Sequence, residues 1–269
     1  MTEPARLKGD DFDVADKKTK EGGLWETIKV IVQALLIALV IRTLLFQPFN
    51  IPSGSLIPTL LIGDYLFVSK YSYGYSHYSL PSFLDLDPGA MPGRLFASQP
   101  KRGDIIVFKL PLDGQTDYIK RLIGLPGDKI QMIHGRLYIN GVIAEREPLP
   151  PYPTNDRFGR PVAATHYEET LPGGVKHEII QLDGDAGSYS NTKVYEVPPD
   201  HYFMMGDNRD DSLDSRVPPE ADGVGYVPFD NLIGRAELIF FSVADSEPAW
   251  EIWRWPWTVR WRRLFQPIR

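Results

Sequence analysis

The chain has 269 residues, of which 43% are apolar and 12% aromatic, so it can bury a sizeable core in one or two domains. It contains no cysteine, which excludes disulfides, thiolate nucleophiles and cysteine-ligated metals. The net charge is −6, and residues 250–269 alone carry +4, so the preceding part is strongly acidic and unsuited to binding nucleic acid.

The N-terminal region combines a polar tail with a long apolar run. Residues 1–23 are predicted to form the tail, and 17 of the 23 residues over 24–46 are apolar. About 20 such residues cross a bilayer, so a transmembrane helix is predicted over 24–46. A cleavable secretory signal, which lacks a small-residue cleavage site here, and a buried soluble helix are the alternatives. More lysine and arginine residues precede the apolar run than lie at its C-terminal end, which favours a cytoplasmic N-terminus.

The remainder is predicted to be β-structure. Short apolar runs bounded by glycine and proline indicate strands. These runs cover 65–69, 104–108, 117–123, 129–133, 136–139, 142–145, 177–182, 194–197, 201–205 and 232–243. Residues 146–176 are rich in proline, glycine and polar side chains and are expected to form a loop. One β domain over 47–249 with an inserted β subdomain at about 128–198 fits this order.

Histidine chemistry is poorly supported. The five histidines show no metal-ligand spacing, so a zinc site or a Ser-His-Asp triad is not expected. The turn Pro52-Ser-Gly-Ser-Leu-Ile-Pro-Thr59 is more informative, because Ser55 can present its hydroxyl to a substrate. Gly54 is expected there because a residue with a Cβ tolerates a tight turn less easily. An ordinary surface turn is the alternative.

Without a suitable histidine, a lysine is the remaining base for a serine nucleophile. Lys120 lies in the apolar strand Asp117-Tyr-Ile-Lys-Arg-Leu-Ile-Gly124, where burial would lower its pKa. A lysine whose tip reaches solvent from an edge strand is the alternative. Lys70 is a rival candidate, but its segment is rich in Ser and Tyr and is expected to be exposed.

A third polar segment follows an apolar strand. It reads Gly206-Asp-Asn-Arg-Asp-Asp-Ser-Leu-Asp-Ser-Arg216. The calcium-loop pattern fails because Arg209 stands where a ligand is required. The mixed charges favour an ion-paired loop that braces a site, with a solvated turn as the alternative.

These three segments, together with Arg102-Gly-Asp-Ile-Ile-Val-Phe108, resemble bacterial type I signal peptidases in content and order. Members of that family are membrane-anchored Ser–Lys endopeptidases that remove signal peptides from exported preproteins. The resemblance covers about residues 24–243 and implies a mainly β, antiparallel, barrel-like catalytic domain behind one transmembrane helix. It also implies the bacterial inner membrane as location, with the catalytic domain on the periplasmic face. Preproteins and membrane lipid are the implied partners, with neither metal nor cofactor.

The resemblance also implies roles for individual residues. Ser55 would be the nucleophile and Lys120 the general base, while the Ser53 hydroxyl and the Ser55 backbone N–H would bind the oxyanion. Ser212 would orient the lysine. The supporting residues would be Asp207, Arg209, Asp214 and Arg216. Two departures are Leu56, where the family often has Met, and a different loop after Arg216.

Two other functions are compatible with the sequence. One is a related Ser–Lys protease that processes a dedicated partner or itself, and the other is an inactive membrane-tethered scaffold. Residues 250–269 contain five tryptophans and five arginines. Such a composition is typical of a segment at a membrane interface, and coverage of an open sheet edge is the alternative.

Overall fold

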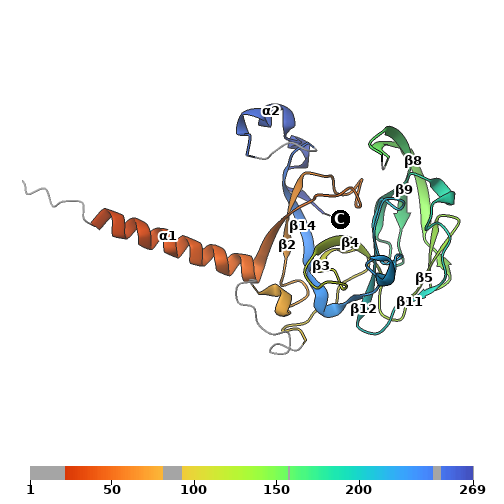
Figure 1. Ribbon diagram of the computed structural model, residues 1–269, viewed down its shortest axis with the longest axis horizontal. Helices are drawn as coiled ribbons and strands as arrows, with labels where there is room; N and C mark the ends of the chain where they lie inside the picture. The colour runs from red at the N-terminus through yellow and green to blue at the C-terminus, as the bar shows by residue number, and fades with distance from the viewer. Residues whose placement is uncertain (1–21, 81–92, 157, 245–249, 269) are drawn as a thin grey trace, which may run out of the picture. The chain divides into compact units, whose positions relative to one another are not determined.

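The computed structural model describes residues 22–80, 93–156, 158–244 and 250–268 (Figure 1). It divides the chain into two compact units, Met1–Leu39 and Val40–Arg269. Most of the predicted tail over 1–23 therefore lies outside the described residues. The two units are considered separately.

The first unit contains most of helix α1 (Gly22–Val40), which a π-helical turn, η1 (Ile41–Leu45), extends into the second unit. The 23 residues Gly23–Leu45 are the only described segment that is long and apolar enough to cross a bilayer. The described side chains of α1 are exposed. The helical part thus covers the span expected over 24–46 except Phe46, which begins the first strand.

The second unit is built on one large antiparallel sheet. Among the described residues it contains eight strands in the order β1-β2-β14-β3-β4-β12-β13, with β15 paired to β14. Their bounds are β1 Phe46–Asn50, β2 Asp64–Ser69, β3 Ile105–Lys109, β4 Asp117–Gly124, β12 His201–Met205, β13 Val227–Pro228, β14 Leu232–Ser242 and β15 Gln266–Pro267. The register of β14 against β3 shifts between Leu232 and Gly234, which is the irregularity of a β-bulge.

Two smaller antiparallel sheets lie between β4 and β12 in the sequence. Their orders are β10-β9-β8 and β11-β5-β6-β7. Their bounds are β5 Lys129–Ile133, β6 Arg136–Ile139, β7 Val142–Ile143, β8 Glu145–Asn155, β9 Pro161–Thr170, β10 Lys176–Gln181 and β11 Tyr195–Glu196. In Figure 1 the labelled strands β5, β8, β9 and β11 gather on one side of β4 and β14. The mainly β, antiparallel fold class is confirmed.

The prediction of a loop over residues 146–176 is wrong, because most of these residues form β8 and β9. β8 carries four prolines, yet it is an edge strand that pairs only with β9, so the missing N–H groups cost few ladder bonds. The pairing skips between Leu149 and Tyr152, where two of these prolines stand. Three short strands that the sequence analysis did not predict also contain proline, namely β1, β13 and β15.

Short connections complete the described part. They are the 3₁₀ turns η2 (His77–Ser79), η5 (Gly184–Ala186), η6 (Pro219–Ala221), η7 (Phe229–Asn231), η8 (Ile252–Arg254) and η9 (Trp261–Arg263), and the one-turn helix α2 (Trp255–Thr258). The core holds the catalytic candidates in place. Ile51, Leu56 and Leu60 are buried in one cluster with side chains of β2, β3 and β14. A second cluster joins Ile123 and Phe203 of the large sheet to strands of the insert.

Candidate active site

Ser55 and Lys120 meet in the structure although 65 positions separate them in the sequence. Ser55 lies in the loop of residues 51–63 between β1 and β2, and Lys120 lies on β4, which pairs with β3 and β12. Lys120 Nζ donates a hydrogen bond to Ser55 Oγ at 2.5 Å. Both residues are buried, with 6% and 4% of their surface exposed. This is the arrangement that a serine nucleophile and a lysine base require.

The loop of residues 51–63, called the nucleophile loop below, has a regular local structure. Its backbone bonds include Ile57 N–H to the Gly54 carbonyl at 3.1 Å and Leu60 N–H to the Leu56 carbonyl at 2.9 Å. Gly54 does not have the left-handed backbone that would require glycine. A Cβ at this position would instead meet Ile57 Cδ1 at 3.0 Å, so space and not backbone conformation limits it. The expected reason for Gly54 is thereby corrected.

The surroundings of Lys120 favour its neutral form. Burial lowers its pKa to about 8, the Asp214 carboxylate opposes this shift, and the Arg216 guanidinium adds to it. Lys70 is also buried, with 3% of its surface exposed, so the expectation that it is exposed is wrong. Its pKa is likewise lowered to about 8 by burial, but its Nζ donates to the Ser79 carbonyl and not to Ser55.

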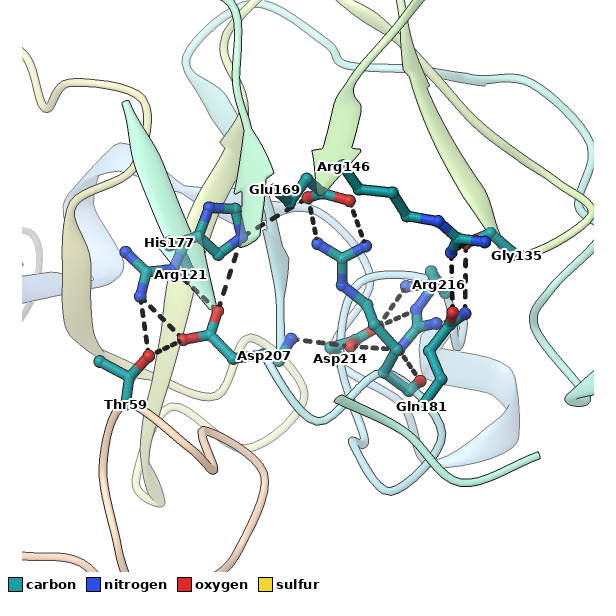
Figure 2. Close-up of polar contacts among 12 residues, drawn as sticks. Thr59, Arg121, Gly135, Arg146, Glu169, His177, Gln181, Asp207, Asp214 and Arg216 are labelled. Carbon is teal, nitrogen blue, oxygen red and sulfur yellow. Dashed lines mark hydrogen bonds and ion pairs between the residues drawn. The ribbon is translucent and has the colours of Figure 1, made fainter. Parts of the chain in front are cut away.

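Two ion pairs that involve the segment of residues 206–216 lie near Ser55 and Lys120. Arg121, which follows Lys120 on β4, donates to both carboxylate oxygens of Asp207 at 2.8 Å (Figure 2). Asp214 accepts from Arg216 Nε and Nη2 at 2.9 and 2.8 Å. Burial alone would raise the pKa of either aspartate, but the paired guanidinium outweighs it and lowers the pKa.

Gly206 connects these ion pairs to Ser55. Its backbone N–H donates to Asp214 Oδ2 at 3.0 Å. A Cβ at Gly206 would lie 2.3 Å from Ser212 Oγ and 2.5 Å from the Ser55 carbonyl oxygen. Asn208 N–H donates to that same carbonyl at 3.1 Å. The segment is therefore packed directly against the backbone of Ser55.

A third pair joins this segment to the insert. Arg209 donates to both carboxylate oxygens of Glu169 on β9, and Arg216 Nη2 donates to the Arg209 carbonyl at 2.7 Å. His177 on β10 lies 3.5 Å from Glu169 Oε2 and 3.9 Å from Asp207 Oδ1 (Figure 2). Burial lowers the pKa of His177 to about 4, so its ring is neutral at physiological pH.

The chain is similar to known proteins over most of its length. The family model described as "Signal peptidase, peptidase S26" matches residues 24–241. Signal peptidase I of Rickettsia typhi is 48% identical over 213 residues, which cover 77% of this chain and 76% of the relative. For signal peptidase I of Rickettsia akari the identity is 45% over 245 residues, with 88% and 85% covered. A crystal structure of a signal peptidase I from Enterococcus faecalis matches with 28% identity and a TM-score of 0.29, covering 51% of this chain and 97% of that one.

The chain belongs to the signal peptidase family, peptidase S26. It is therefore a serine endopeptidase with signal peptidase function, and the resemblance seen in the sequence is confirmed. The family match includes the nucleophile loop, β4 and the segment 206–216. It ends at residue 241, so the C-terminal segment of residues 250–268 lies outside it.

Several residues of this signal peptidase site were not identified from the sequence. Glu169 and His177 had no motif that marked them, and they lie in or next to the stretch that was expected to be a loop. Thr59 closes the turn that carries Ser55, but no role was predicted for it. Arg121 did give a signal, because a cation in an apolar strand needs a carboxylate partner when it is buried. The carboxylate that it meets, Asp207, was among the expected supporting residues.

The two remaining serines of the expected set lie close to Ser55. Ser53 is exposed in the same turn as Ser55. Ser212 Oγ is buried against Gly206 and has no hydrogen-bond partner among the described residues, so the structure does not bond it to Lys120. The described residues also contain no group of three or more histidine or acidic side chains arranged to hold a metal ion.

Proposed function

We propose that this chain is a membrane-anchored signal peptidase that removes N-terminal signal peptides from exported preproteins with Ser55 as nucleophile and Lys120 as general base. The observation that carries the proposal is the 2.5 Å hydrogen bond between two buried side chains. The lowered pKa of Lys120 supports it, because a neutral amine is needed to accept a proton.

The reaction follows from this pair. Neutral Lys120 accepts the Ser55 proton while Oγ attacks the scissile carbonyl carbon, which gives a tetrahedral intermediate. The resulting ammonium returns the proton to the leaving amine, and the C–N bond breaks to leave an acyl-enzyme. Lys120 then takes a proton from water, whose oxygen attacks the ester and releases the signal-peptide carboxylate and Ser55.

Two donors are assigned to the oxyanion. The Ser55 N–H and the Ser53 hydroxyl belong to one short turn, so both can point at the carbonyl oxygen that Oγ attacks. Ser212 would orient Lys120 in the substrate complex. Asp207, Arg209, Asp214 and Arg216 support the site through the ion pairs described above, which hold the segment 206–216 against the nucleophile loop.

The apolar helix supplies the anchor. A segment of 23 residues with exposed apolar side chains is suited to lipid and is long enough to span the hydrocarbon core. More lysine and arginine residues precede this helix than lie at its far end, which favours a cytoplasmic N-terminus and a body over residues 47–249 on the periplasmic face of the bacterial inner membrane. The insert is assigned to about residues 128–198.

The C-terminal segment of residues 250–268 is proposed as a second lipid contact. Four of its tryptophans are exposed: Trp250, Trp253, Trp257 and Trp261. Trp255 instead packs against Phe241 of β14, with ring centroids 5.0 Å apart. Exposed indoles beside arginines favour the headgroup region of a bilayer.

Single substitutions test the mechanism. Ser55→Ala and Lys120→Met in the full chain should each lower cleavage of a preprotein by roughly three orders of magnitude, because the nucleophile or its base is lost. Lys70→Met is the matched control, since it also removes a buried lysine with a lowered pKa. Substantial cleavage by a folded Ser55→Ala or Lys120→Met variant contradicts the proposal.

A preprotein unrelated to the host is the second arm of this experiment. Cleavage by the parent chain supports a general signal peptidase. A parent chain that cleaves only itself or one partner indicates the dedicated Ser–Lys protease. A folded parent chain that cleaves none of these substrates indicates the inactive scaffold.

A further inference from the structure

The end of the chain returns to the loop that carries Ser55. After the described part of the chain resumes at Trp250, the residues from 259 onward lie against β14 and the nucleophile loop. Arg263 donates to the Asp64 carboxylate through Nε at 3.0 Å and Nη2 at 2.5 Å. Its Nη2 also donates to the Thr59 carbonyl at 3.0 Å, and Arg260 Nη1 donates to the Ile62 carbonyl at 2.8 Å. Two arginines thus hold three positions in and directly after the nucleophile loop.

Asp64 is the centre of these contacts. It is fully buried, and its carboxylate accepts the Leu61 N–H at 2.8 Å and the Ser242 hydroxyl at 2.6 Å in addition to Arg263. The side chain of Arg263 is 18% exposed, so this ion pair is largely shielded from water. Its geometry, with two donors on two oxygens, fixes orientation as well as distance. The pair therefore ties the far half of the loop to the end of β14.

Thr59 links this pair to the catalytic side. Its carbonyl accepts from Arg263, while its hydroxyl donates to Asp207 Oδ2 at 2.6 Å and accepts from Arg121 Nη2 at 3.2 Å. Arg121 is adjacent to Lys120 on β4. A single residue four positions after Ser55 is thus held from the C-terminal segment through its backbone and from the active-site ion pair through its side chain.

The C-terminal segment is itself fixed on the large sheet. β15 pairs with β14, and Ile268 N–H donates to the Glu237 carbonyl at 2.9 Å. Arg260 N–H donates to the Ser242 carbonyl at 2.9 Å, and Val259 forms a bridge with Val243. Ile268 packs against the same cluster as Leu56 and Leu60 of the nucleophile loop. The two arginines therefore project from a segment that is hydrogen-bonded to the large sheet.

We propose that Arg263 is a positioning residue for catalysis, which keeps the nucleophile loop in the place where Ser55 Oγ reaches Lys120 Nζ. The inference rests on the proposed role of Ser55 and extends it to a segment outside the family match at residues 24–241. Arg260 acts in the same way on the Ile62 carbonyl. Arg263 does not touch the reacting atoms, so its effect is exerted through the position of the loop.

Three variants of the full chain, purified in detergent, separate positioning from charge compensation. Arg263→Met removes every donor but leaves Asp64 buried with fewer partners. In the second variant Asp64→Asn is added, because the amide can accept from Leu61 N–H, donate to Ser242 Oγ and remain uncharged. Arg263→Lys keeps the charge but lacks the planar fork that serves Asp64 and Thr59 together. Arg262→Met is the matched control, since Arg262 is exposed and adjacent.

The expected result is a fall in kcat that exceeds any change in KM, because the displaced loop carries the nucleophile and the donors to the oxyanion. A displacement of about 1 Å at a reacting atom lowers the rate by on the order of 100-fold, so we expect a 10- to 100-fold lower kcat for Arg263→Met and for the double variant. The kcat of Arg263→Lys should lie between these values and that of the parent, and the kcat of Arg262→Met should equal that of the parent. The double variant should recover melting temperature without recovering kcat.

Hydrogen–deuterium exchange gives a readout that does not depend on the identity of the nucleophile. In the Arg263 variants the amides of residues 51–63 should exchange at least about tenfold faster, while those of β3 and β4 should not change. Faster loop exchange with unchanged kcat shows that Arg263 holds the loop but does not position Ser55 for catalysis, which overturns the positioning role, whereas an active Ser55→Ala variant overturns the proposed function itself. Unchanged exchange, or kcat that returns to the parent value in the double variant, overturns the positioning role.

Discussion

At the scale of single residues, the proposed mechanism depends on the protonation of one lysine. A pKa of about 8 for Lys120 means that its amine is mostly protonated at neutral pH and mostly neutral above pH 8. Since only the neutral amine accepts the Ser55 proton, kcat should rise about tenfold per pH unit below 8 and level off above it. Initial rates of peptide cleavage between pH 6 and 10 measure this profile. A rate that stays flat over pH 6 to 9 would exclude lysine as the base.

Gly206 gives a second prediction at this scale. A Cβ there would meet both Ser212 Oγ and the Ser55 carbonyl oxygen at 2.5 Å or less, so the segment 206–216 would have to move away from the nucleophile loop. Gly206→Ala should lower kcat on the order of 100-fold and the free energy of unfolding by about 1–3 kcal/mol. Gly54→Ala is the matched control, because its Cβ would meet at closest the flexible end of Ile57 at 3.0 Å. Equal kcat values for the two variants would contradict the prediction.

The residues that the sequence identified were those with a chemical reason at their own position. A lysine in an apolar strand and a serine in a stiff turn each signal unusual surroundings, and these two meet at 2.5 Å. Glu169 and His177 gave no such signal, because an acidic side chain or a histidine in a polar stretch is ordinary. Their importance comes from Arg209 and Asp207, which tertiary structure alone brings to them.

At the scale of secondary structure, the pair of Glu169 and Arg209 joins the strands of the insert to the segment 206–216. Both side chains are almost completely buried, so removing the charge of one leaves the other uncompensated. Glu169→Gln should therefore lower the free energy of unfolding by about 3 kcal/mol or more. The matched variant Glu168→Gln, on the same strand, loses a largely exposed pair with Lys176 and should change stability little. Thermal unfolding of both variants checks this, and equal melting temperatures would contradict it.

Strands were predictable where hydrophobic alternation was clear. Along β4, Tyr118 and Leu122 face one cluster while Ile119 packs against another, as alternation requires. The sequence did not predict strands β1, β8, β13 and β15, because their prolines indicate turns when only neighbours in sequence are considered. Each of them lies at the end of a sheet order or outside its main path, which a single sequence does not reveal.

At the scale of the whole molecule, charge is distributed unevenly. The chain carries −6 in total, yet residues 250–269 carry +4. An anionic membrane therefore repels most of the body and attracts the segment that also exposes four tryptophans. If this segment contacts lipid, the orientation of the body on the membrane follows from this asymmetry as well as from the helical anchor.

A chain that begins at Val40 tests this contact without the apolar helix, because Val40–Arg269 forms a compact unit by itself. It should sediment with vesicles of anionic phosphatidylglycerol and much less with phosphatidylcholine, and added salt should weaken the binding. Replacing Trp253, Trp257 and Trp261 by Ser should weaken it by about tenfold or more, since each exposed indole loses its place at the headgroups. The matched control replaces the exposed Phe96 and Phe158 by Ser and should bind like the parent. Unchanged vesicle binding together with a lower melting temperature of the tryptophan variant would instead assign these rings to covering the sheet edge.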